Sequence, residues 1–295
     1  MINRAKNMSK NLRTENNPFF LQDGGRAMIS LGPLRQEKSC PYSCAFCYVQ
    51  DDFSSYLNYS ISDIILFLRR NKDKYNIVYI SGDTDSFAPP RREQGLELLS
   101  RVADEVSCDV LFATRSIFDD QSYSIIKAVN DNQLAKGYRL FAGTSITRLS
   151  PDLSYLEPFP VPTPDERIKN LINLKKCGAV TMLGLRPFLP VVPVSDYEAI
   201  LKQLVGYLDI ALGECFYFIR NGKIQSRVFP CGISADIEQR ITTGHKMDFD
   251  DNNSIWDVWD SSEYESRARA ICNELGIVFS MRSSDGIRRY LNNER

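Results

Sequence analysis

The stretch Lys38-Ser39-Cys40-Pro41-Tyr42-Ser43-Cys44-Ala45-Phe46-Cys47-Tyr48 contains three of the eight cysteines of this chain, with the spacing C-x3-C-x2-C. Thiolates are soft ligands that suit iron–sulfur clusters and zinc. Three thiolates can bind three irons of a [4Fe–4S] cube and leave the fourth iron open to another ligand. Proline and serine between the cysteines favour a turn-rich loop. The stretch therefore predicts a cluster-binding loop in which Cys40, Cys44 and Cys47 are the metal ligands.

Two other interpretations of the three cysteines stay open. A structural zinc site normally has four protein ligands, and the only histidine, His245, is far away in the sequence. A redox dithiol would use Cys44 and Cys47 and leave Cys40 unexplained. The other five cysteines are scattered singly and form no second CxxC pair, which fits a reducing, cytoplasmic compartment.

Composition narrows the class of protein. The 295 residues, 43% apolar and 25% charged, are ordinary for a globular chain with one large α/β domain or two small ones. No apolar run reaches 18 residues and the N-terminus lacks a signal-peptide core, so we expect a cytoplasmic protein without a membrane partner. The net charge of −1 allows a nucleic-acid partner but does not favour one, because dedicated duplex binders usually carry a basic excess.

Compact β-rich runs alternate with helical patterns from about residue 26 to residue 220. The expected strands are 27–31, 76–80, 109–114, 139–146, 180–185 and 216–219. Such alternation predicts a parallel sheet with helical crossovers, and six repeats match an α/β fold of the partial (β/α)6 TIM-like barrel type. The cysteine loop follows the first strand, so we expect it at the C-terminal rim, where the sites of such barrels gather.

Capping and turn residues predict where several helices begin or end and where a hairpin turns. Ser60, with Asp63 three residues later, predicts a capped helix. Pro164 is expected to open a helix that Gly178 closes. Asn221-Gly222 between two β-rich runs predicts a hairpin.

The last 75 residues look different from the rest. Trp256 and Trp259 are expected to start a helical stretch, and residues 277–279 to form a short strand. The expected divisions are an N-terminal segment (1–25), a core barrel (26–220) and a C-terminal extension that caps the barrel (221–295).

A C-x3-C-x2-C spacing with an aromatic residue before the last cysteine is the signature of radical S-adenosylmethionine (SAM) enzymes, which the cysteine stretch resembles. From about residue 17 to residue 193 the chain resembles the spore photoproduct lyase branch of that superfamily. The segments that carry this resemblance are Asn17-Pro18, Cys47-Tyr48-Val49, residues 81–93 (SGDTDSFAPPRRE), Ala113-Thr114-Arg115-Ser116, Gly143-Thr144-Ser145-Ile146-Thr147, Leu156-Glu157-Pro158 with Arg167, and Pro187-Phe188-Leu189-Pro190.

The resemblance implies a radical SAM enzyme with one [4Fe–4S] cluster, SAM, and a reducing partner of the flavodoxin or ferredoxin type. Reductive cleavage of SAM would give a 5′-deoxyadenosyl radical, which would abstract hydrogen from an organic substrate. Arg115 would face the SAM carboxylate, because a guanidinium can fork onto both oxygens, and Gly82 would allow close approach of the backbone. The residues implied to bind the cofactor are Phe46, Tyr48, Ser81, Gly82, Asp83, Arg115 and Ser145.

The substrate and the hydrogen donor stay open. True spore photoproduct lyases carry a donor cysteine just before the segment matching Thr84-Asp85, where this chain has Ile80-Ser81-Gly82-Asp83. Cys231 is a candidate donor if the segment after the hairpin approaches the barrel mouth. Repair of a nucleic-acid or nucleotide lesion is one alternative function, and a zinc-stabilised binding protein without catalysis is another. Glu157 and Arg167 are expected to form an ion pair beneath the site.

Overall fold

The computed structural model describes residues 19–22, 25–31, 40–48, 59–82, 84–246 and 254–293. The strands of its large sheet are β1 (Phe19–Gln22), β2 (Arg26–Ile29), β3 (Ile77–Ile80), β4 (Asp109–Ala113), β5 (Leu140–Ser145), β6 (Val180–Leu185), β7 (Ile210–Gly213) and β11 (Val278–Ser280). A small sheet contains β8 (Tyr217–Phe218), β9 (Ile241–His245) and β10 (Trp256–Trp259). The helices are α2 (Ile61–Arg70), α3 (Arg92–Glu105), α4 (Asp120–Ala135), the 3-10 helix η1 (Pro151–Leu156), α5 (Pro164–Lys176), α6 (Val194–Gln203), α7 (Lys223–Val228), α8 (Ala235–Glu238), α9 (Ser262–Glu274) and α10 (Ser283–Asn293).

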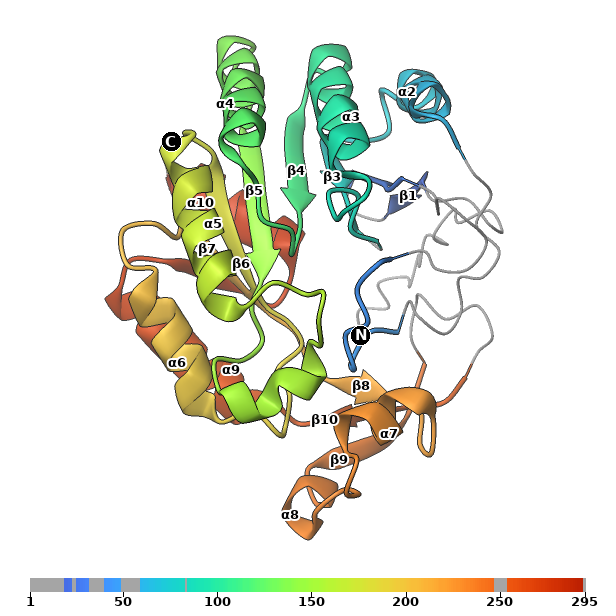
Figure 1. The fold of residues 1–295 in the computed structure, drawn as a ribbon, viewed down its shortest axis with the longest axis vertical. Helices are drawn as coiled ribbons and strands as arrows, with labels where there is room; N and C mark the ends of the chain where they lie inside the picture. Colours follow the sequence, from blue (N-terminus) through green and yellow to red (C-terminus); the bar gives the residue numbers. More distant parts are fainter. Residues whose placement is uncertain are drawn as a thin grey trace, which may run out of the picture.

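The large sheet is parallel except at one edge (Figure 1). Its order is β1-β2-β3-β4-β5-β6-β7-β11, and β1 pairs antiparallel with β2. Every other neighbouring pair is parallel. This arrangement brings the C-terminal ends of the strands to one edge, and it confirms the predicted α/β class. None of the described helices is long and apolar enough to cross a membrane.

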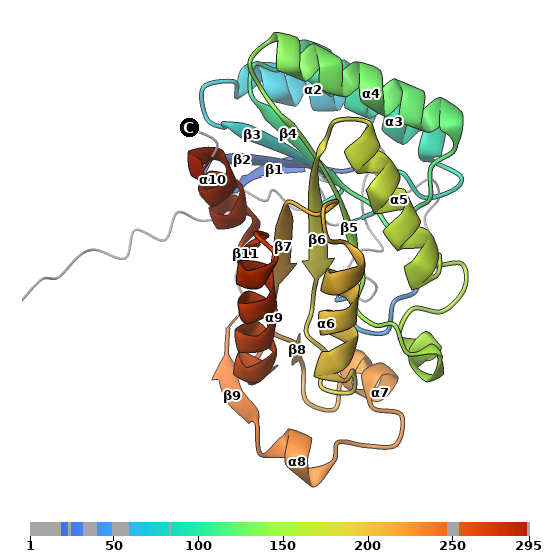
Figure 2. The same cartoon turned by 90° about the vertical axis from the view of Figure 1, so that its left-hand side faces the viewer.

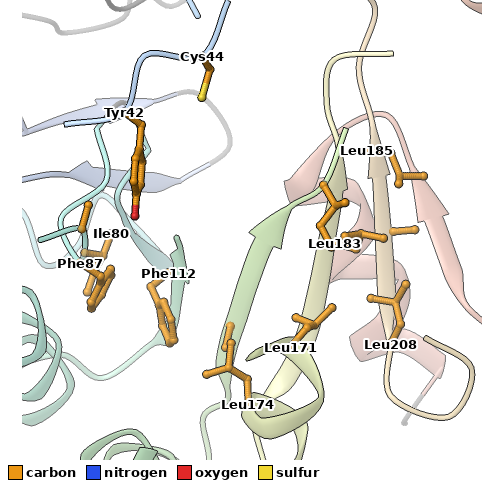
Figure 3. Packing of buried hydrophobic residues seen from close by; sticks show 14 of the residues in the cluster. Tyr42, Cys44, Ile80, Phe87, Phe112, Leu171, Leu174, Leu183, Leu185 and Leu208 are labelled. Atoms are coloured by element: carbon orange, nitrogen blue, oxygen red, sulfur yellow. The ribbon is translucent and has the colours of Figure 1, made fainter. Parts of the chain in front are cut away.

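The outer face of the sheet carries the main core. Alternate strand residues such as Ile80 and Phe112 belong to one large buried cluster together with helix residues, as the two-residue period of a strand requires. Figure 3 shows Leu171 of α5 and Leu183 of β6 in one part of this cluster. Tyr42 of the cysteine loop lies in another part, on the side of Ile80 and Phe87. The apolar face of each crossover helix is therefore buried against the sheet.

Helix α10 covers part of the inner face. Ile287 belongs to a second buried cluster that contains Tyr79 and other residues of the inner face. The ring of Tyr290 meets that of Phe141 edge to face, with 6.3 Å between centroids. Figure 2 shows α10 (dark red) beside β2 and above β11. The last helix thus joins the two ends of the open barrel from the inside.

Local capping signals are confirmed. Ser60 and Asp63 form a reciprocal capping box at the start of α2. Thr163 and Glu166 form another at α5, which has Pro164 in its first turn. Gly178 follows α5 with φ +87°, a value that favours glycine.

Two strand predictions near residue 220 are wrong. The sixth parallel strand is β7, not residues 216–219. All four residues of β7 are buried, which is typical of a strand in a parallel sheet. Residues 216–219 instead alternate between more buried and more exposed positions, and β8 pairs antiparallel with β10 in the small sheet. The predicted hairpin at Asn221-Gly222 is a helix start instead, since Gly222 is the N-cap of α7.

The C-terminal residues also differ from expectation in their details. Trp256 and Trp259 lie in strand β10, and the helix begins later, at Ser262. The short strand expected at 277–279 exists as β11 and extends the large sheet as a seventh parallel strand. Residues 221–295 therefore supply a strand and an inner helix to the barrel, as well as strands β9 and β10 of the small sheet.

Candidate functional site

The cysteine loop, defined as residues 40–48, is held at the C-terminal edge of the sheet from two sides. The Ala45 amide donates to the Leu156 carbonyl of η1 at 2.8 Å. On the other side, Arg227 of α7 donates to the carbonyl oxygens of Ala45 and Cys47, at 2.9 and 3.1 Å. The Cys47 amide bonds the Cys44 carbonyl at 3.1 Å, which closes a tight turn. The backbone of the loop is therefore fixed independently of any metal.

The three thiols of this loop differ in exposure. Cys44 is buried, whereas Cys40 and Cys47 are partly exposed. Burial raises the pKa of Cys40 to about 11 and that of Cys44 to about 12, so these groups are thiols at neutral pH and would release protons on binding a metal.

The donor set fits an iron–sulfur cube. Within the described ranges, no group of three or more His, Cys, Asp or Glu side chains is gathered closely enough to hold a single metal ion. The thiolates of a [4Fe–4S] cube bind separate irons and need not surround one point. Three soft donors in one backbone-fixed loop, two of them partly exposed, suit that group.

Arg115 follows β4 and lies beside the cysteine loop. Its guanidinium carbon is 5.7 Å from the centroid of the Phe46 ring, a cation–π contact. Its Nε lies 3.3 Å from Glu157 Oε1, and its side chain is 24% exposed. Burial alone would lower the pKa of Arg115, but Cys44, Glu157 and the other two loop cysteines together raise it. The group is therefore a permanent cation next to all three thiols.

Glu157 and Arg167 form the predicted ion pair. Both side chains are fully buried, and Arg167 donates to both carboxylate oxygens, at 2.9 and 2.5 Å. Burial would raise the pKa of Glu157, but Arg167 and then Arg115 hold it below its ordinary value. Arg167 also donates to the carbonyl of Ser145 at the end of β5. One carboxylate thus connects the loops that follow β4 and β5.

Asp85 fixes the backbone on which Arg115 stands. Its carboxylate accepts from the Arg115 amide at 2.7 Å, from Thr114 Oγ1 at 2.8 Å and from the Phe87 amide at 3.0 Å. Burial raises the pKa of Asp85 although these hydrogen bonds oppose the shift. Asp85 therefore acts as a buried turn cap.

The structure places the other implied cofactor-binding residues around the same edge. Phe46 is buried beneath Arg115. Tyr48 is partly exposed. Ser145 ends β5 and is also partly exposed. These three side chains and Arg115 come from three different segments of the chain, which the fold brings to one rim.

The turn after β3 is tightly built. Ser81 has φ +68° and is buried, and its Oγ accepts from the Ser86 amide at 3.0 Å. A Cβ placed on Gly82 would lie 2.2 Å from the terminal methyl of Met28. Asp83 lies outside the described residues.

Cys231 and His245 are both exposed. Cys231 is exposed in the segment after α7, with Tyr155 of η1 as an electrostatic neighbour. None of the contacts described for Cys231 joins it to the cysteine loop. His245 ends the exposed strand β9, where its ring bonds Thr242 at 2.9 Å.

Three further residues, Tyr217, Glu214 and Arg186, lie near the cysteine loop, and the sequence interpretation missed them. Tyr217 donates to Glu214 Oε1 at 3.3 Å. Burial is the main cause that raises the pKa of Tyr217 well above its usual value, and Glu214 is the next. Cys47 also raises this pKa, whereas the positive charge of Arg186 lowers it. The Tyr48 and Tyr217 rings are 6.4 Å apart. Glu214 and Arg186 directly follow strands β7 and β6, and a polar residue at a strand end was the available signal.

Comparison with known proteins supports the fold. No protein-family model matches the sequence, and no curated protein sequence matches it. Spore photoproduct lyase complexed with dinucleoside spore photoproduct is similar in structure, with a TM-score of 0.60, 14% identity, and coverage of 81% of this chain and 72% of that chain. A mutant of that lyase gives a TM-score of 0.65 at 13% identity, over 90% of this chain and 78% of the other.

A further mutant of the lyase, with bound AdoMet and dinucleoside spore photoproduct, gives a TM-score of 0.62 at 12% identity, over 86% of this chain and 75% of the other. At such identities the likeness is one of fold. The predicted fold class is confirmed, since the chain shares its fold with spore photoproduct lyase.

Proposed function

We propose that this chain is a radical SAM enzyme that binds a [4Fe–4S] cluster through Cys40, Cys44 and Cys47. When bound, the cluster and SAM would supply a 5′-deoxyadenosyl radical for hydrogen abstraction from an organic substrate. The observation that carries the proposal is the position of Arg115, a buttressed cation beside a loop of three soft ligands at the C-terminal rim of the barrel.

Arg115 would bind the carboxylate of SAM. Among the described residues its hydrogen-bonding partner is Glu157, through Nε, so the two terminal nitrogens are the atoms available for a carboxylate. A planar guanidinium suits a bidentate contact with that group. Glu157 and Asp85 would be positioning residues, because they hold the side chain and the backbone of Arg115.

The rest of the cofactor would be surrounded by Phe46, Tyr48 and the turn at Ser81, Gly82 and Asp83. Ser145 would be a hydrogen-bonding group. An aromatic wall and a buried turn would exclude water from the site, which protects a reactive radical from side reactions. Cys231 is retained only as a candidate hydrogen donor, since its exposed position gives it no advantage over other groups.

A reducing partner of the flavodoxin or ferredoxin type would supply the electron. This partner would dock at helix α7, because Arg227 links that helix to the backbone at Cys47. None of the eight cysteines, which all lie in the described ranges, forms a disulfide, and this supports the proposed reducing, cytoplasmic location.

The decisive experiment is anaerobic reconstitution with iron and sulfide, followed by dithionite and SAM, with chromatography for 5′-deoxyadenosine. The proposal expects product from the wild type and none from Cys40→Ala. Cys108→Ala is the matched control, since Cys108 is a buried core thiol of the same chain. A protein that binds only zinc, or whose Cys40→Ala variant still cleaves SAM, would contradict the proposal.

Lesion repair is the second candidate, because the solved lyase complexed with dinucleoside spore photoproduct shares the fold. The same reconstituted protein can be given that dinucleoside and assayed for its repair. Turnover would establish repair. SAM cleavage without repair would leave the first proposal standing and remove this one.

A further inference from the structure

One aromatic side chain near the rim of the barrel is almost completely exposed. Phe159, in the loop between β5 and α5, is 96% exposed, and the next most exposed large apolar residue in the described ranges, Ile255, is at 53%. Single apolar residues that are partly exposed are ordinary on a protein surface. A phenylalanine with nearly all of its surface in water gains nothing from burial in the monomer, so its exposure needs another explanation.

The backbone that carries Phe159 is fixed. Glu157 and Val161, on either side, are buried, and the Val161 amide donates to the Pro158 carbonyl at 3.0 Å, which closes a turn around Phe159. Pro158 and Pro160 restrict this turn (residues 158–161) further, because a proline ring fixes φ. A rigid group loses little conformational entropy on binding, and aromatic anchors carry much of the binding energy of protein interfaces. The turn therefore presents Phe159 as a preformed anchor.

The Phe159 turn lies beside the cysteine loop. The Leu156 carbonyl accepts from the Ala45 amide at 2.8 Å, and Ala45 directly follows Cys44. Phe159 is three residues after Leu156, so their Cα atoms are at most about 11 Å apart even in a fully extended chain. A protein seated on Phe159 would therefore lie a short distance from the proposed cluster, as electron transfer between two proteins requires.

Tyr155 connects this turn to helix α7. It is 38% exposed, and its hydroxyl donates to the Val228 carbonyl of α7 at 3.2 Å. Figures 1 and 2 both show η1, the short yellow-green helix, beside α7 in orange. Helix α7 also bonds the cysteine loop through Arg227. The two helices η1 and α7 therefore contact each other and the same loop.

The charges of this surface favour an acidic protein. Residues 221–232, which include α7, contain Lys223 and Arg227 and no acid. The exposed acids of the neighbouring segments, Asp152 and Asp165, lie in η1 and α5. Two basic residues are few for a nucleic-acid surface, which is usually strongly basic, but they can complement acidic groups at the rim of a protein interface.

We propose that Phe159 and Tyr155, together with α7, form the docking surface for the acidic protein that delivers the electron to the proposed cluster. One electron would leave the reduced flavin or iron–sulfur group of this partner and enter the cluster, and no atom would be transferred. Weak electron-transfer complexes bury less surface than stable ones, which suits a surface with one main anchor. The inference rests on the proposed function, because without the cluster the electron would have no destination.

The test uses a flavodoxin, an acidic flavin protein, as the probe. Calorimetric titration of the reconstituted full chain with oxidised flavodoxin measures the affinity, and anaerobic mixing with its reduced form follows oxidation of the flavin. Phe159→Ser should weaken binding at least about tenfold, because truncation of an aromatic anchor costs this much or more. Cleavage of SAM driven by dithionite should be unchanged, since a small reductant needs no docking surface.

Matched variants separate docking from folding. Leu134→Ser is the control, since it removes a side chain that is 43% exposed in the last turn of α4, and it should bind flavodoxin as the wild type does. Phe159→Trp should keep the affinity, because it leaves an aromatic anchor in the same place. Lys223→Gln should slow association mainly at low salt, since rising ionic strength screens the attraction between charges.

Three outcomes overturn the inference. One is equal flavodoxin affinity in Phe159→Ser and Leu134→Ser, and another is no binding of flavodoxin by the wild type. The third is a wild type that dimerises in size-exclusion chromatography while Phe159→Ser stays monomeric, which would assign the surface to a second copy of the chain.

Cleavage of SAM with dithionite tests the proposed function separately. If the wild type fails to cleave SAM, the proposed cluster chemistry is wrong. If it cleaves SAM while Phe159→Ser and Leu134→Ser bind flavodoxin equally, only the docking surface is wrong.

Discussion

Replacing Glu157 by glutamine tests how the rim of the barrel is held together. The side chains of Glu157 and Arg167 are both fully buried, and Arg115 contacts the same carboxylate with 24% of its side chain exposed. Glutamine keeps the shape of the side chain and removes its charge. Arg167 would then be a buried cation without a counter-ion.

The expected loss follows from this burial. Breaking one partner of a buried ion pair costs about 3–5 kcal/mol, a large part of the roughly 5–15 kcal/mol that stabilises a typical protein. For a chain of this size the midpoint of thermal unfolding should fall by about 6–10 °C. Arg115→Gln should cost only about 1 kcal/mol, because solvent screens the partly exposed group.

Thermal and urea unfolding at neutral pH measure these losses, and Glu105→Gln serves as the control. Glu105 makes a bidentate pair with Arg69 on the surface, so its replacement should have little effect. If Glu157→Gln is no more destabilising than Glu105→Gln, the role assigned to the buried pair is refuted.

The pH dependence gives a second check on the same carboxylate. Burial would raise the pKa of Glu157, but Arg167 and Arg115 hold it below the ordinary value of 4.5. A lowered pKa in the folded state means that this stabilisation is fully present above pH 4.5 and is lost as the pH falls through the folded value. The difference between wild type and Glu157→Gln should therefore shrink below about pH 4.5. A constant difference would contradict the assignment.

Three further predictions concern the rim. Cys44→Ala should abolish iron loading, measured by iron content and absorbance after reconstitution, whereas Cys108→Ala should retain it; equal loading of the two variants would exclude Cys44 as a ligand. Gly82→Ala should fold normally, because the flexible methyl of Met28 can move away from the new Cβ, yet bind SAM more weakly in calorimetry; unchanged affinity would argue against close backbone approach there. Asp85→Asn should lower the free energy of unfolding in urea by about 1–3 kcal/mol, since an amide cannot accept all the hydrogen bonds that the carboxylate accepts; an unchanged value would show that those bonds contribute little.

The parts of the fold that depend on residues close together in the sequence were predictable. The capping box at Ser60 and the proline-started α5 are specified within one helical turn. The strand at 210–213 was missed because Phe216 to Ile219 looked equally β-rich, and only pairing with β6 or β10 distinguishes the two. The place of α10 on the inner face depends on contacts with strands far away in sequence, such as the one between Ser283 and Arg26.

The candidate site divides in the same way. A compact motif identified the cysteine loop, and a segment that resembled a known family identified Arg115. Arg186 and Glu214 also directly follow strands, but they stand outside the segments that carried the resemblance. The bidentate pair of Glu157 and Arg167 was expected, whereas the additional contact with Arg115 requires the folded arrangement of three loops.

The inner helix α10 has a consequence for the newly synthesised protein. Until residues 283–293 have left the ribosome, the apolar inner residues of the first strands, including Met28 and Tyr79, have no helix to cover them. Exposed apolar surface and unfinished sheets attract chaperones and promote aggregation. The nascent chain therefore has to wait for almost the whole described sequence before its barrel is closed, so a slow stretch of translation near residue 280 would prolong the period in which it is most vulnerable.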